Sequence, residues 1–218
     1  MPLPFEHPEW SAVMGETMHP GGEALSRRLL SFCAFAPKKR VLDAGCGAGA
    51  TLELLVKEGL EAVGVDHSEE RLILAQQKGP TIKGDLAKLP FENESFDGAI
   101  CECVLSQQEN LLTVLAELSR VLKDGGILGI TDLYLLTDSC GRTPGEKGSC
   151  ANGARPREEM VDAFRLQGLE SFFFEDHPGA LRECAARLVW YGIMTAPKKT
   201  CRRLGYGLWL CRKASATK

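Results

Sequence analysis

VLDAGCGAGAT, residues 41–51, decides the fold of this chain. Two apolar residues lead into Asp43, three glycines follow at alternate positions, and a helix-forming run begins at Thr51. This pattern predicts a buried strand that turns sharply into a helix. Glycine lets a ligand approach the main chain closely, and a helix N-terminus offers it free N–H groups. The stretch indicates a nucleotide-like ligand. Its G-x-G-x-G spacing matches neither the dinucleotide G-x-G-x-x-G nor a phosphate loop.

Strand and helix patterns alternate from this stretch onward. Further strands are expected at 61–66, 81–83, 98–101 and 127–136, with a turn at 123–126 before the last of them. Five alternations imply right-handed crossovers and a mostly parallel sheet. Ligands then bind beyond the carboxyl ends of the strands.

The second half of the chain has a looser pattern. Residues 137–156 are rich in Gly, Ser and Pro and form a loop too long for a plain connection, so it is either mobile or functional. A helix is expected at 157–167, a strand at 169–176 and an apolar last strand at 205–213. Between these strands lies a helical insert at 179–203, which roofs the ligand site or forms a packing or dimer surface.

Several polar groups map to one edge of the predicted sheet. The glycine loop, Asp66, Asp85 and the Cys101–Cys103 segment each follow the carboxyl end of a strand. Asp66 lies about 20 residues past the loop, where an acid can bind ribose hydroxyls, although it could instead cap the next helix. Asp85 could accept a hydrogen bond from an adenine amine, or it is an ordinary turn residue.

Five of these segments resemble motifs of the class I S-adenosylmethionine (SAM)-dependent methyltransferases, in the single-domain, small-molecule, type 11-like branch. They are LDAGCGAGA, GVDHS, GDLAKLPF, FDGAICECVL and RVLKDGGIL. The likeness covers roughly residues 25–135. It implies an α/β fold, a Rossmann-like three-layer sandwich whose seven-stranded, mostly parallel sheet has an antiparallel last strand.

The resemblance also implies the ligand and its contacts. The cofactor would be SAM, and the product S-adenosylhomocysteine. Asp43, Gly45 and Gly47 would contact its methionine part, Asp66 its ribose, and Asp85 and Leu86 its adenine. The full set of expected cofactor-binding residues is Asp43, Gly45, Cys46, Gly47, Asp66, His67, Asp85, Leu86 and Cys101.

Methyl transfer is an in-line displacement on an activated sulfonium centre, so positioning and desolvation should dominate. A base is needed only where the acceptor keeps its proton at neutral pH, and no catalytic triad is expected. Three acceptor-side candidates remain. Cys103 either lines the acceptor pocket or only packs, Asp132 is a base or a structural carboxylate, and His177 is a base or part of a helix cap.

Composition limits the remaining possibilities. The chain has 26 basic and 29 acidic residues in 218, a net charge of −3, which disfavours nucleic acid as a partner. It has no apolar run of about 20 residues, so no membrane span is expected, and its first residues lack the pattern of a secretory signal. Nine cysteines without a C-x-x-C pair indicate free thiols in a reducing cytoplasm and no metal site.

We therefore expect one domain over residues 1–218, with an N-terminal arm and helix over 1–36, acting on a small-molecule acceptor as a monomer or homodimer. Two alternatives remain. A soft acceptor, arsenite or a thiol, is suggested by Cys103, Cys140 and Cys150, because thiolates bind soft ions. A non-catalytic SAM-binding accessory protein would keep the same loop. Protein or RNA methylation is less favoured, since no added recognition domain is present.

Overall fold

The computed structural model describes residues 13–136, 153–193 and 204–215. Its sheet has the order β3-β2-β1-β4-β5-β8-β7, with a short β6 beside β5. Pairing is parallel from β3 through to β5, whereas β8 runs antiparallel to both β5 and β7. The strands are β1 Arg40–Ala44, β2 Glu61–Asp66, β3 Thr81–Lys83, β4 Phe96–Glu102, β5 Leu122–Leu135, β6 Arg155–Pro156, β7 Leu169–Asp176 and β8 Leu204–Lys213.

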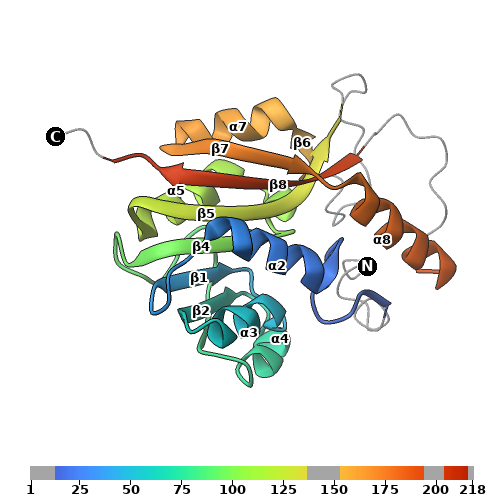
Figure 1. The fold of residues 1–218 in the computed structure, drawn as a ribbon, viewed down its shortest axis with the longest axis horizontal. Helices are drawn as coiled ribbons and strands as arrows, with labels where there is room; N and C mark the ends of the chain where they lie inside the picture. The colour runs from blue at the N-terminus through green and yellow to red at the C-terminus, as the bar shows by residue number, and fades with distance from the viewer. Residues whose placement is uncertain (1–12, 137–152, 194–203, 216–218) are drawn as a thin grey trace.

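Helices cover both faces of the sheet, as expected for a three-layer sandwich. One core lies between the sheet and α2 and α3, and a second lies between the sheet and α5 and α7. Figure 1 shows α2 and α3 on the near face and α5 on the far face. The helices are α2 Gly22–Cys33, α3 Ala50–Lys57, α4 Glu69–Ala75, α5 Leu111–Val121, α7 Arg157–Leu166 and α8 Pro178–Trp190, with a 3-10 turn, η2, at Leu105–Gln107.

Local sequence explains where these helices form. On α2, Leu25, Leu29 and Cys33 recur at intervals of four and are buried on one face. The Asn110 side chain accepts a hydrogen bond from the Thr113 N–H (3.2 Å) and so caps the start of α5. Pro178 stands at the first turn of α8, where its missing N–H costs nothing.

The turn predicted at 123–126 is wrong. Strand β5 already begins at Leu122, which pairs with Phe96, and the pairing resumes between Gly98 and Ile127, two residues further along β4 and five further along β5. The additional residues are accommodated by this register shift, with Gly125 at φ +75°. A glycine can adopt this torsion without a steric penalty, so the segment bulges within a strand instead of separating two elements.

The first described residues lie beside α8. Met14 is buried against Cys184 and Leu188 of that helix. Figure 1 shows α8 reaching past the sheet at the same end as the segment that precedes α2. The insert therefore packs on the N-terminal arm. Much of the predicted 137–156 loop, including Cys140 and Cys150, lies outside the described residues, as does 194–203 of the insert.

No helix in the described ranges is both long and apolar enough to cross a bilayer.

Candidate active site

A cavity of about 900 Å³ opens at the carboxyl ends of β1, β2 and β4. This volume is in the usual range for sites that hold a small molecule or cofactor. Every predicted cofactor-binding residue except Cys101 lines it, together with Cys103. These residues are Asp43, Gly45, Cys46, Gly47, Asp66, His67, Asp85, Leu86 and Cys103.

The glycine loop forms the floor of the cavity. Gly45, Gly47 and Gly49 all have positive φ angles, of 79°, 51° and 80°. A Cβ at Gly45 would lie 2.5 Å from Val104 Cγ2, so this turn accepts no larger residue. A Cβ at Gly47 would instead point into open space, which leaves the main chain there accessible to a ligand.

Asp66 ties the end of β2 to this loop. Its Oδ2 accepts a hydrogen bond from the Gly47 N–H (2.9 Å), and its Oδ1 accepts one from the Ser68 N–H (2.8 Å). The cap of α4 is Ser68, whose Oγ accepts from the Arg71 N–H. Because a carboxylate has about four acceptor sites, Asp66 keeps capacity for further donors from the cavity.

Asp43 has an incomplete set of partners. It is only 3% exposed, and its Oδ2 has no hydrogen-bond partner. Burial raises the pKa of Asp43 well above its usual value, and the nearby charges of Glu102 and Asp66 raise it further. A buried carboxylate in this position favours a positively charged hydrogen-bond donor as a ligand.

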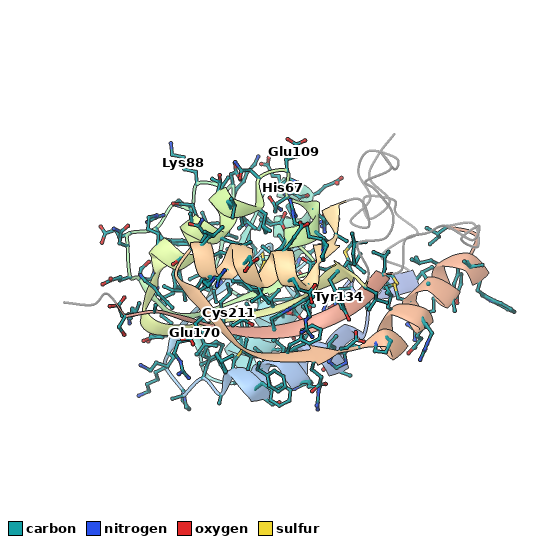
Figure 2. The ribbon with its side chains drawn as sticks, turned by 90° about the horizontal axis from the view of Figure 1, so that it is seen from above. His67, Lys88, Glu109, Tyr134, Glu170 and Cys211 are labelled. Carbon is teal, nitrogen blue, oxygen red and sulfur yellow. The ribbon has the colours of Figure 1, made fainter. Side chains whose placement is uncertain are left out.

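Asp85, Leu86 and His67 lie toward the other end of the cavity. Asp85 Oδ1 accepts from the Ala87 N–H (2.8 Å), which makes a turn, while Leu86 presents a buried apolar surface. The His67 side chain is 75% exposed, with Nδ1 3.5 Å from Asp66 Oδ1. Figure 2 shows His67 and Glu109, two of the lining residues, on the same side of the molecule.

The two cysteines at the end of β4 point in different directions. Cys101 is fully buried in the core beneath α5 and α7, and it does not line the cavity. Cys103 does line it and has a φ of 55°. This left-handed torsion ends the strand, so residues 101 and 103 no longer share a face. Among the described residues, no cluster of His, Cys, Asp or Glu could hold a metal ion.

Neither Asp132 nor His177 reaches the cavity. Asp132 is fully buried and accepts hydrogen bonds from the Ser106 N–H (3.0 Å) and the Leu133 N–H (2.7 Å). Burial raises its pKa, and these bonds oppose the change. His177 Nε2 lies 3.0 Å from Glu175 Oε1, just before α8. Asp132 therefore has structural partners, whereas His177 Nε2 is near Glu175 but makes no hydrogen bond.

Sequence reasoning missed a buried polar network on the cavity wall. Glu102, at the end of β4, accepts hydrogen bonds from the hydroxyls of Ser26 and Thr51, and His19 lies beside it. Residues 16–19 of the N-terminal arm also line the cavity. The available signal was Glu102 itself, an acid between two cysteines at the same sheet edge as Asp66.

Comparisons with known proteins agree with this architecture. Residues 42–130 match a family model described as a methyltransferase domain. The uncharacterized methyltransferase YodH of Bacillus subtilis is 38% identical over 117 residues, which is 50% of each chain. The sterol 24-C-methyltransferase of Candida albicans is 26% identical over 181 residues, 76% of this chain and 48% of that protein.

Solved structures share the fold over most of the chain. The [4+2]-cyclase SpnF has a TM-score of 0.82 at 20% identity, covering 98% of this chain and 94% of its own. Phosphoethanolamine N-methyltransferase 2 of Haemonchus contortus, in complex with SAM, has a TM-score of 0.76 at 17% identity, covering 94% and 56%. At these identities the likeness shows the fold alone. The chain spans about half the length of the curated relatives it matches.

Proposed function

We propose that this chain, which carries a class I SAM-dependent methyltransferase domain, transfers a methyl group from SAM to a small-molecule acceptor. The observation that carries the proposal is the unpaired Asp43 Oδ2 in the cavity. SAM has a positively charged α-ammonium group that can donate to this oxygen. Its sulfonium charge would also be favoured near the carboxylates of Asp43, Asp66 and Glu102.

The rest of the cavity suits the other parts of SAM. Asp66 has free acceptor sites for two ribose hydroxyls, at the strand end where nucleotide-binding sheets place such an acid. Asp85 can accept from the adenine amine, and Leu86 can pack on the ring. Cys46 and Gly47 offer main-chain groups in the glycine loop, and His67 lies at the rim of the cavity.

When bound, SAM supplies a methyl group already activated by the sulfonium sulfur. The protein therefore has to hold that group in line with the acceptor and keep water away. Gly45, Gly47 and Asp43 fix one end of the ligand and Asp66 its middle, so the direction of the methyl group is set by groups on β1 and β2. Cys103 and the arm residues 16–19 complete the wall beyond it.

We also propose that residues 1–218 act as one domain in which the N-terminal arm roofs the acceptor side. Residues 16–19 line the cavity, whereas the described part of the 179–203 insert does not. The insert acts through the arm, because α8 holds Met14. Residues 137–156 belong to the same proposed domain, and the proposed oligomeric state is a monomer or a homodimer.

A reducing cytoplasmic location is supported by the cysteines. Five of the six cysteines in the described ranges are buried. Buried thiols pack as small apolar groups and do not need an oxidising compartment. The net charge of −3 likewise supports a small molecule over a nucleic acid as the partner.

The test is transfer of label from methyl-labelled SAM in an extract of the producing cells. We expect label in the low-molecular-weight fraction, and its mass identifies the acceptor. Label in protein or RNA would contradict the proposed acceptor class but not the proposed methyltransferase activity. SAM binding without any transfer would favour a non-methylating protein on the same fold, as with the neighbour named as a cyclase.

A further inference from the structure

The polar network around Glu102 joins segments that are distant in sequence. Its hydroxyl donors are Ser26 on α2, Thr51 on α3 and Thr131 on β5. Ser26 Oγ lies 3.1 Å from Oε1 and 3.0 Å from Oε2 of Glu102, and Thr131 Oγ1 lies 3.4 Å from Oε1. The Glu102 side chain is 6% exposed. Three hydroxyls on one carboxylate hold it in a single orientation.

Hydrogen counting assigns the direction of these bonds. The Tyr206 O–H donates to Thr131 Oγ1 (3.1 Å), so the Thr131 hydrogen is left for Glu102. The Ser26 and Thr51 hydroxyls each have one hydrogen and donate it to the same carboxylate. The three hydroxyls thereby fix the orientation of the Glu102 carboxylate in the cavity wall.

His19 completes the network from the arm. Its Nδ1 lies 3.0 Å from the Pro20 carbonyl oxygen, which only accepts, so Nδ1 carries a proton. Its Nε2 lies 3.1 Å from Ser26 Oγ and 3.6 Å from Glu102 Oε1. Ser26 Oγ therefore bridges the His19 ring and the Glu102 carboxylate.

This network lies on the acceptor side of the cavity. Glu102, His19 and Thr51 all line it, next to Cys103 and the arm. Glu102 is close enough to Asp43 for its charge to raise the pKa of that residue. In the proposed binding mode Asp43 holds the methionine end of the ligand, and Glu102 would then lie on a neighbouring part of the cavity wall.

We propose that Glu102 is the catalytic residue that accepts the proton lost by the methyl acceptor, with Ser26 and His19 as positioning residues. The acceptor in this proposal is a hydroxyl or an amine, which holds a proton at neutral pH. Thiolate, carboxylate and arsenite acceptors need no such base. This inference rests on the proposed function.

The lone pair of the acceptor oxygen or nitrogen forms the new bond to the methyl carbon, and the carbon–sulfur bond breaks with its electron pair going to sulfur. The acceptor O–H or N–H proton passes to a Glu102 oxygen. The proton then passes from Glu102 to water, so that the residue can act again.

Other titratable groups face Glu102 from the surrounding elements. They are Cys33 on α2, Asp43 on β1 and Tyr206 on β8, besides Cys101 and Cys103 on its own segment. Burial raises the pKa of Cys33, Cys101 and Tyr206, so these groups stay protonated at neutral pH. The contribution of Asp43 is separated from that of Glu102 by the Asp43→Asn variant, whose affinity for SAM is measured.

The experiment compares Glu102→Gln with wild type in the label-transfer assay between pH 6 and 9. The acceptors tested are the cell extract and a panel of phenols, amines, carboxylic acids, thiols and arsenite. We expect transfer to fall by roughly 100-fold or more, the usual worth of a general base. The loss should shrink as the pH rises. SAM affinity by calorimetry should change less than about threefold, and Glu102→Asp should recover part of the rate.

His19→Asn should give a smaller loss with an altered pH profile, because it acts through Ser26. Glu170→Gln is the matched control, an exposed acid near the start of β7 and thus at the opposite sheet edge. Three outcomes would overturn this inference alone. They are near-normal transfer by Glu102→Gln, loss of SAM binding in Glu102→Gln, and a methylated thiol, carboxylate or arsenic product. An inactive wild type would overturn the proposed function with it.

Discussion

Two carboxylates that line the cavity, Asp43 on β1 and Glu102 at the end of β4, differ in their hydrogen-bond partners. Glu102 has three hydroxyl donors from three elements, and His19 lies beside it. Asp43 is as deeply buried and has an oxygen with no partner. The difference indicates that the fold supplies the partners of Glu102, whereas a ligand has to supply those of Asp43.

The largest effect on stability should follow from removing Glu102. Glu102→Ala leaves buried hydroxyls of Ser26, Thr51 and Thr131 without their acceptor, which costs about 3 kcal/mol. For a chain of this size the melting temperature should fall by about 6–12 °C. Differential scanning calorimetry checks this. A fall of under about 2 °C would show that the network contributes little to the fold.

Asp66→Ala tests the neighbouring strand end. The change removes the acceptor of the Gly47 N–H and of the proposed ribose hydroxyls. SAM affinity should weaken by about 1–3 kcal/mol, the cost of leaving buried polar groups unpaired. Isothermal titration calorimetry measures it, with Asp85→Ala, on a more exposed turn, expected to have the smaller effect. Unchanged affinity for Asp66→Ala would place the ligand elsewhere.

Asp43→Asn should raise the stability of the ligand-free protein, whereas Glu102→Ala should lower it. The amide removes a buried carboxyl whose ionisation the fold disfavours. Binding residues replaced in this way commonly gain about 0.5–2 kcal/mol of stability at the expense of function. Thermal melts of the two ligand-free proteins test this. A lower melting temperature in the variant would mean that Asp43 has a stabilising partner.

The pH dependence of stability follows from the same residue. Because the pKa of Asp43 is raised in the folded state, the folded protein binds more protons than the unfolded chain above the ordinary carboxyl range. This contribution is favourable at low pH and is lost as the pH rises toward the folded-state pKa. Urea melts across pH 5–8 should show a slope for wild type that is smaller in Asp43→Asn. Equal slopes would assign the effect to other groups.

The smallest effect is expected at His177. Its Nε2 lies 3.0 Å from Glu175 Oε1 without forming a hydrogen bond, and it does not line the cavity. Because its side chain lies outside the cavity, His177→Ala should change both SAM affinity and label transfer by less than about twofold. A loss of transfer comparable to that of Glu102→Gln would show that α8 contributes directly to the reaction.

Much of the architecture was predictable because its determinants are local. Each motif from the glycine loop to Asp85 spans a few residues at one strand end, and parallel order brings these ends together. The Glu102 network was not predictable in this way, since Ser26 and Glu102 are 76 residues apart. The sequence pattern predicted that Cys101 contacts the cofactor, because the left-handed torsion at Cys103 has no clear sequence signal. The strand through 123–126 was missed because its glycines are typical of a turn.

If the buried, unpartnered Oδ2 of Asp43 receives the cationic end of SAM, the Asp43→Asn variant must bind SAM more weakly than wild type, and a calorimetric titration of SAM into both proteins measures this difference. We predict saturable binding to wild type with one ligand per chain. In the variant, affinity should fall by about 30-fold or more, the usual cost of breaking a buried charge pair, while the folded state is retained. Equal affinity in the two proteins, or no binding to wild type, would contradict the account.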